Sequence, residues 1–207
     1  MKLFYELVQV ALGEKLKLSC IPSDEEWADI FSLSQKQAVV GLLLLALDKL
    51  SANGQKPPMA LLYEWIGMSE QIKAQNRLVN KRCGEITVWF ADAGFRTCIL
   101  KGQGNALMYS EPLLRTSGDI DLWVEGKREE IYNFVFSRYP NAQDGDMHIE
   151  VPFFKDVIVE VHYFPRYSSI PKYDKRLKAW FRENSDAQFS NKVILDKDCP
   201  VDVCVPT

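Results

Sequence analysis

The sequence lacks the compositional biases that mark fibrous, disordered or highly charged proteins. Only 11 of its 207 residues are glycine and 10 are proline, which excludes collagen-like and low-complexity classes. Lysine and arginine number 25 against 28 aspartates and glutamates, so no overall positive field is present to attract a polyanion. The length predicts one compact globular unit or two small ones.

Long apolar segments and closely paired cysteines are also missing. The longest apolar run, residues 38–47, has ten residues, whereas a membrane span needs about 20. Glu6 and Gln9 interrupt the apolar stretch at the N-terminus, which argues against a signal peptide. The five cysteines include no Cys-x-x-Cys pair, which disfavours a zinc site or a disulfide framework. We therefore expect a cytoplasmic protein with reduced thiols and no membrane partner.

The hydrophobic pattern changes near Gly94. Before this residue, apolar side chains recur at helical spacing, and a long helix is expected over 59–93. After it, strand-like and helix-like segments alternate, which predicts an α+β fold class. The predicted domains are an N-terminal helical region, 1–94, and a sheet-containing core, 95–207. In the core we expect strands over 95–100, 120–124, 148–154, 157–163 and 192–195, with helices over 105–110, 128–138 and after Pro165.

Two aspartates stand two residues apart at the start of one of the predicted strands. Asp119 and Asp121 should project from the same face, while Ile120 and Leu122 face the core. Adjacent carboxylates repel unless a cation lies between them, and Mg²⁺ prefers such oxygen ligands together with substrate phosphates. Glu160, in an otherwise apolar strand, is the expected third ligand because a buried acid needs a partner. The alternatives are a turn cap for the aspartates and a solvent-facing position for Glu160.

Gly102 follows a predicted strand and precedes a predicted short helix. A glycine at such a place lets the backbone approach a phosphate closely, so the segment fits triphosphate binding. It is not a Rossmann fingerprint, because the third glycine is absent, and it is not a P-loop, because no Gly-Lys-Ser/Thr follows.

Together these segments resemble the signature of the polymerase-beta-like nucleotidyltransferase superfamily, in which a glycine turn precedes an Asp-x-Asp strand. Here Gly102 and Gln103 are followed by a spacer of fifteen residues and then by Asp119-Ile120-Asp121-Leu122. More narrowly, Leu-Lys-Gly, Arg-x-x-Gly-Asp-Ile-Asp-Leu and a downstream acid-x-His are similar to a mostly uncharacterised bacterial nucleotidyltransferase family. The motifs cover roughly residues 98–164, and the helical segment before them resembles that family by pattern only.

The resemblance implies a mixed sheet flanked by helices, with Mg²⁺ or Mn²⁺ held by Asp119, Asp121 and Glu160. It implies transfer of a nucleoside monophosphate from a nucleoside triphosphate, such as ATP, to an acceptor hydroxyl with release of pyrophosphate. Two ions would divide the work, one at the acceptor hydroxyl and one at the triphosphate. The acceptor stays open among a small molecule, a protein and an RNA end. The residues assigned to the donor nucleotide are Lys101, Gly102, Gln103, Arg115, Ser117 and Gly118.

Two features depart from the family pattern. Gln103 stands where the superfamily usually places serine or glycine, and the chain ends at Thr207 although family members look longer. We expect Lys101 and Arg115 to compensate as phosphate partners, and we expect a C-terminal helical part to be missing. The same departures favour an alternative function, a catalytically silent nucleotide-binding or regulatory module on the same scaffold.

The remaining candidates are two histidines and a basic segment. His162 is expected to orient Glu160, to contact substrate or simply to be packed, and His148 is expected to be structural or at the surface. Basic and aromatic residues interleave over 166–182, a pattern that can follow a nucleic-acid strand, but a solvated helix face is the plainer interpretation, and nucleic acid is the less favoured partner. A glycosidase is disfavoured, because acids two apart on one strand are poorly placed to flank a scissile bond.

Overall fold

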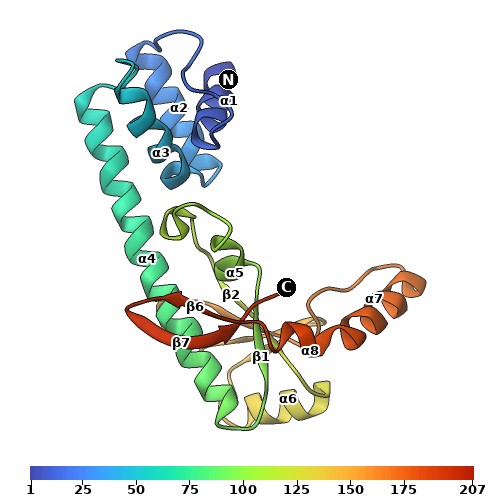
Figure 1. Cartoon of the computed structure of the whole chain (residues 1–207). Helices are drawn as coiled ribbons and strands as arrows, with labels where there is room; N and C mark the ends of the chain where they lie inside the picture. The colour runs from blue at the N-terminus through green and yellow to red at the C-terminus, as the bar shows by residue number, and fades with distance from the viewer. The chain divides into compact units, whose positions relative to one another are not determined.

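The computed structural model describes residues 1–198 and 200–207 with their side chains. Contacts within the chain group it into two units (Figure 1). Unit 1 comprises residues 1–76 and 109–116, and unit 2 comprises residues 77–108 and 117–207. The domain boundary at Gly94 stays a prediction. No helix in the described part of the chain is both long enough and apolar enough to cross a bilayer.

Unit 1 is helical. It contains α1 (Lys2–Ala11), α2 (Asp24–Lys36), α3 (Val40–Ser51), the first half of α4 (Met59–Ala91) and the 3₁₀ turn η1 (Pro112–Leu114). A capping box starts α2, since Ser23 Oγ accepts from the Glu26 N–H at 3.2 Å and Glu26 Oε2 accepts from the Ser23 N–H at 2.8 Å. Each helix presents one apolar stripe to a common core that includes Leu7, Trp27, Leu43 and Trp65.

The segment 109–116 is fastened to this helical unit by its backbone. Asn76 Nδ2 donates to the carbonyl oxygens of Leu113 at 2.8 Å and Arg115 at 2.6 Å. Thr116 Oγ1 donates to the carbonyl oxygen of Ala38 at 2.9 Å. Gly41 lies against this segment so closely that a Cβ there would be 2.2 Å from the carbonyl oxygen of Leu114. Glycine is therefore required at position 41 for the segment to pack as it does.

Unit 2 is built on a five-stranded sheet with the order β1-β2-β5-β4-β3. Strands β2 and β5 are parallel, and the other neighbours are antiparallel, so the predicted mixed sheet in an α+β fold is confirmed. The strands are β1 (Thr97–Leu100), β2 (Ile120–Val124), β3 (Gln143–Asp144), β4 (His148–Val151) and β5 (Val159–His162). The flanking elements are α5 (Gly102–Ala106), α6 (Arg128–Phe136), α7 (Pro171–Glu183), α8 (Ser185–Gln188) and a hairpin of β6 (Lys192–Asp196) and β7 (Cys199–Cys204).

The two faces of this sheet differ in chemistry. One face is apolar and packs on the second half of α4, where residues at helical spacing form a single stripe: Val79, Cys83, Ile86 and Phe90. Paired strand residues such as Leu122 and Val161 belong to this core. The opposite face carries Asp121, Glu160 and His162, together with Trp123, whose ring lies 4.4 Å from that of Phe189. Because side chains alternate between the two faces, packing of the apolar face in the core also fixes which residues lie on the opposite face of the sheet.

Two elements differ from the sequence prediction. The short helix expected over 105–110 is α5, which begins at Gly102, because the turn at Lys101 leads directly into helical backbone. Strand β7 lies outside the strand ranges predicted above, and its Val203, together with the following Val205, lies in the core of unit 2. The predicted long helix, the strand pair before Tyr163 and the strand near 192–195 are present.

Gly41→Ala should destabilise the protein, because the new methyl group would collide with backbone rather than with a movable side chain. We expect a loss of about 1–3 kcal/mol in the free energy of unfolding, measured by urea denaturation. Gly67→Ala is the matched control, because a methyl group on this exposed glycine of α4 would meet no atom within 4 Å. The control should be stabilised by up to about 1 kcal/mol through helix propensity. Equal behaviour of the two variants would contradict the packing described for position 41.

Candidate active site

The parallel pairing of β2 with β5 places the acids of two strands next to each other. Asp121 is directly opposite Glu160 in the register, and Asp119 immediately precedes β2. Asp119, Asp121 and Glu160 each offer one carboxylate oxygen, and these three atoms lie within 4.8 Å of one another. The three predicted metal ligands are thus brought together, although their role as ligands stays a prediction.

Asp121 is the buried member of this carboxylate trio, and it is held by two cationic or polar side chains. Lys101 Nζ lies 2.8 Å from Asp121 Oδ1, and His162 Nε2 lies 2.9 Å from the same oxygen. Burial favours the neutral acid, but the hydrogen bonds from His162 and Lys101 outweigh it and keep the pKa of Asp121 below its ordinary value. Asp121 is therefore an anion at neutral pH, as a metal ligand must be.

His162 connects the acids of the two strands. Its Nε2 lies 2.9 Å from Asp121 Oδ1 and 3.3 Å from Glu160 Oε2, and its side chain is only 4% exposed. Nδ1 of the same ring is buried and has no hydrogen-bond partner among the described residues. In the absence of a metal, a neutral His162 therefore carries its proton on Nε2, from which it donates to Asp121 Oδ1.

The predicted phosphate turn adjoins the trio and has an unusual backbone. Lys101 adopts φ 46° and ψ −126°, a region that side-chain-bearing residues rarely occupy. Gly102 follows with φ 23°, and a Cβ there would lie 3.8 Å from the carbonyl oxygen of Asp119. The turn and the first aspartate are thus neighbours. Strain held beside three carboxylates is characteristic of functional sites.

The side chain of Gln103 is directed into the protein rather than toward the turn. It is buried, and its Nε2 donates to Asn80 Oδ1 on α4. The departure from serine or glycine at this position therefore has a packing role: it ties α5 to the long helix. Only the backbone of Gln103 remains for a contact with donor phosphates.

The other predicted donor contacts are distributed over both units. Arg115 belongs to unit 1. Ser117 and Gly118 belong to unit 2 and lead into Asp119, with the Ser117 hydroxyl buried and unbonded among the described residues. Contacts of these three residues with a nucleotide stay predictions.

The carboxylate trio fits a hard divalent cation such as Mg²⁺ in its donor chemistry. Three oxygen ligands on one sheet face would leave the remaining positions of an octahedron to water and phosphate oxygens. Asp119 is exposed and Glu160 is partly exposed, so the cluster is open to a large anionic substrate. The hydrogen bonds from Lys101 and His162 to Asp121 both go to Oδ1 and do not involve Oδ2.

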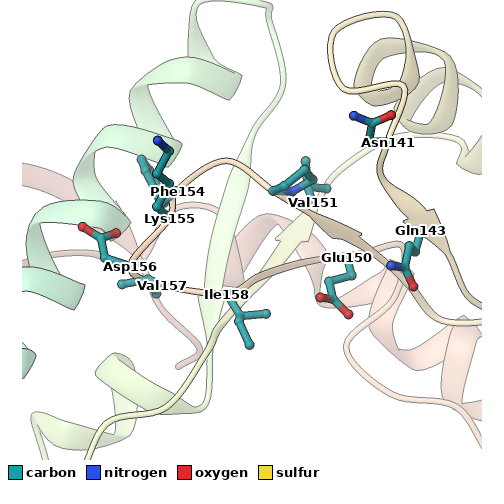
Figure 2. Close-up of a pocket in the computed structure, with 10 residues that line it drawn as sticks. Asn141, Gln143, Glu150, Val151, Phe154, Lys155, Asp156, Val157 and Ile158 are labelled. Carbon is teal, nitrogen blue, oxygen red and sulfur yellow. The ribbon is translucent and has the colours of Figure 1, made fainter.

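A hollow of about 270 Å³ lies beside β4 (Figure 2). It is lined by residues of β3, β4 and the β4–β5 connection, including Gln143, Glu150, Lys155 and Asp156. Glu150 pairs directly with Glu160 across the β4–β5 ladder. The hollow therefore borders the acidic face of the sheet from the side of β4.

His148 belongs to the same cluster, which the sequence did not reveal. Its Nδ1 lies 3.5 Å from Glu160 Oε2, and its ring centroid lies 5.1 Å from that of His162. A two-residue turn at 155–156 would pair residue 149 with 162 and turn His148 to the other face. The actual register pairs His148 with His162. Placing His148 in this cluster from the sequence would therefore have required the correct register, which differs by one residue from that of a two-residue turn.

One known family matches the chain. The family described as uncharacterised nucleotidyltransferase matches residues 23–202. No curated protein and no solved structure matches the chain.

Lys101→Gly should be more stable than Lys101→Ala, because both variants lose the ion pair with Asp121 but only glycine relieves the backbone strain. The strain costs on the order of 1–3 kcal/mol. Glycine also makes the unfolded chain more flexible, which offsets part of the stability gained when the strain is relieved. We expect a net difference of about 1 kcal/mol in urea denaturation at neutral pH. Greater stability of the alanine variant would show that the turn is not strained.

Proposed function

The chain belongs to a family of uncharacterised nucleotidyltransferases, and we propose that it moves a nucleoside monophosphate from a nucleoside triphosphate to an acceptor hydroxyl, releasing pyrophosphate. This proposal rests on one observation: Asp119, Asp121 and Glu160 each place a carboxylate oxygen within 4.8 Å of the other two. Nucleotidyl transfer needs such a cluster because its substrate and its transition state both carry several negative charges.

Asp119, Asp121 and Glu160 are the residues that would hold the metal. Bound Mg²⁺, in one or two ions, would neutralise the triphosphate and the developing charge on the acceptor and leaving oxygens. The protein's contribution is to present its oxygens at fixed positions. Hydrogen-bonded strands supply two of the ligands, and His162 holds the carboxylates of both strands from the buried side.

Lys101 is suited to the donor phosphates. Its side chain is 55% exposed although its ammonium group reaches Asp121, so the same group can donate to a phosphate at the mouth of the site. The turn beside it brings backbone close to Asp119 without a side chain at Gly102. The lysine and the turn follow β1, and the three acids lie on or next to the neighbouring strands β2 and β5, so that a cation, exposed backbone and metal-binding oxygens are close to one another.

The position of Gln103 favours the active enzyme over the silent module. The alternative rested in part on Gln103, which stands where serine or glycine is usual at the phosphate turn and so affects the contacts with the donor phosphates. Gln103 instead packs against α4 and bonds Asn80, which leaves the turn unobstructed by this side chain.

Removing single acids from the trio should abolish Mg²⁺-dependent binding of nucleoside triphosphates. We expect Asp119→Ala and Asp121→Asn to lower pyrophosphate release by about 10²–10³-fold or more, the effect of deleting one preorganised electrostatic group. Calorimetric titration of each of the four ribonucleoside triphosphates with Mg²⁺ would identify the donor. Asp119 is exposed and the asparagine keeps the shape of Asp121, so neither change should unfold the protein.

Glu150→Gln is the matched control, because Glu150 is an exposed acid on the same sheet face, one strand away from Glu160. It should leave triphosphate binding within about twofold of the wild type. Failure of the wild type to bind any triphosphate would contradict the proposal. Tight Mg²⁺-dependent binding without pyrophosphate release toward small-molecule, protein or RNA acceptors would instead support the silent module.

A further inference from the structure

Both histidines of the chain meet at one carboxylate. The sequence contains only two histidines, and the β4–β5 register places them opposite each other. His148 Nδ1 lies 3.5 Å and His162 Nε2 lies 3.3 Å from the same oxygen, Glu160 Oε2. These three side chains each offer one ligand atom, and the atoms lie within 4.8 Å of one another.

The spacing matches that of ligands around a metal better than that of hydrogen-bonded groups. A good N–H···O bond is about 2.7–3.2 Å long, shorter than either distance to Glu160 Oε2. Ligands held about 2.0–2.2 Å from a tetrahedral ion are separated by about 3.3–3.5 Å from one another. Both contacts fall in this second range.

We propose that His148 Nδ1, His162 Nε2 and Glu160 Oε2 form a site for a divalent transition-metal ion, of which Zn²⁺ is the simplest representative. Imidazole nitrogens favour such borderline ions, whereas Mg²⁺ prefers oxygen ligands alone. A water supplies the fourth position, since Asp121 Oδ1 lies 2.9 Å from His162 Nε2, which is a hydrogen-bonding distance rather than the spacing of two ligands. The neutral His162 ring then carries its proton on Nδ1. The site shares Glu160 with the carboxylate trio but does not depend on nucleotidyl transfer.

Access and rigidity also fit a metal site. His162 is buried and fixed, while the side chains of His148 and Glu160 are 33% and 23% exposed. An ion can therefore enter past His148 and meet two ligands on β5 that the sheet already holds in place. Two ligands on one strand and the third on its hydrogen-bonded neighbour make this a rigid donor set.

The test is titration of the untagged protein with Zn²⁺ alone, followed by calorimetry and by the ¹⁵N resonances of the two imidazole rings. Because the chain has no other histidine, every imidazole signal reports on this site. We expect both rings to shift with one equivalent of Zn²⁺ and neither to coordinate Mg²⁺. His148→Ala should weaken Zn²⁺ binding by at least about tenfold, since even loss of an outer-shell partner has that effect.

Asp119→Ala is the discriminating variant, because Asp119 belongs to the carboxylate trio but not to the histidine site. It should keep Zn²⁺ binding within about threefold while losing Mg²⁺-dependent triphosphate binding. The inference is overturned if Zn²⁺ shifts neither ring, or if His148→Ala binds Zn²⁺ as tightly as the wild type. Since His148 is partly exposed, that variant should fold, and each result can be separated from failure of the nucleotidyltransferase proposal.

Discussion

The parallel ladder between β2 and β5 is the constraint on which the rest of the site depends. It sets Asp121 opposite Glu160, and the like charges of these two carboxylates repel each other. The register cannot slip by one residue to relieve this repulsion, because a slip would expose Leu122, Val161 and their neighbours and bury the acids in the apolar core. Hydrophobic packing against α4 on one face therefore holds the carboxylates together on the other.

The residues around the acids show how that repulsion is tolerated. Lys101 and His162 both bond Asp121, one from the turn after β1 and one from β5. The turn is itself strained at Lys101, and the short helix that follows is tied to α4 through Gln103 and Asn80. Val205, after β7, packs closely against the same helix, since a Cβ on Gly104 would lie 3.2 Å from the valine side chain. A strained turn persists only when such contacts determine it.

Much of this arrangement could be predicted from local pattern. The period-two alternation around Asp119 and Asp121 and the isolated Glu160 predicted three acids on one sheet face, and the helical stripe on α4 predicted a long helix. The remaining features depend on tertiary pairing. The role of His148 depends on a single residue of register in the β4–β5 connection, and β7 contains a proline that local propensity disfavours. The packing of Gln103 depends on Asn80, 23 residues away.

Charge balance connects the carboxylate trio with the histidine pair. Three carboxylates and the ammonium group of Lys101 leave two negative charges when both histidines are neutral, and one divalent cation balances them. A triphosphate adds several more negative charges, so a second cation is needed once the donor binds. Glu160 belongs to both of the proposed donor sets. An ion on the histidine side would draw electron density from Glu160 and weaken its hold on Mg²⁺, whereas an empty histidine side would leave Glu160 fully available. If both proposed sites bind their ions, occupancy of one and affinity of the other would be coupled through a single carboxylate, and by reciprocity each ion would change the other's affinity by the same factor.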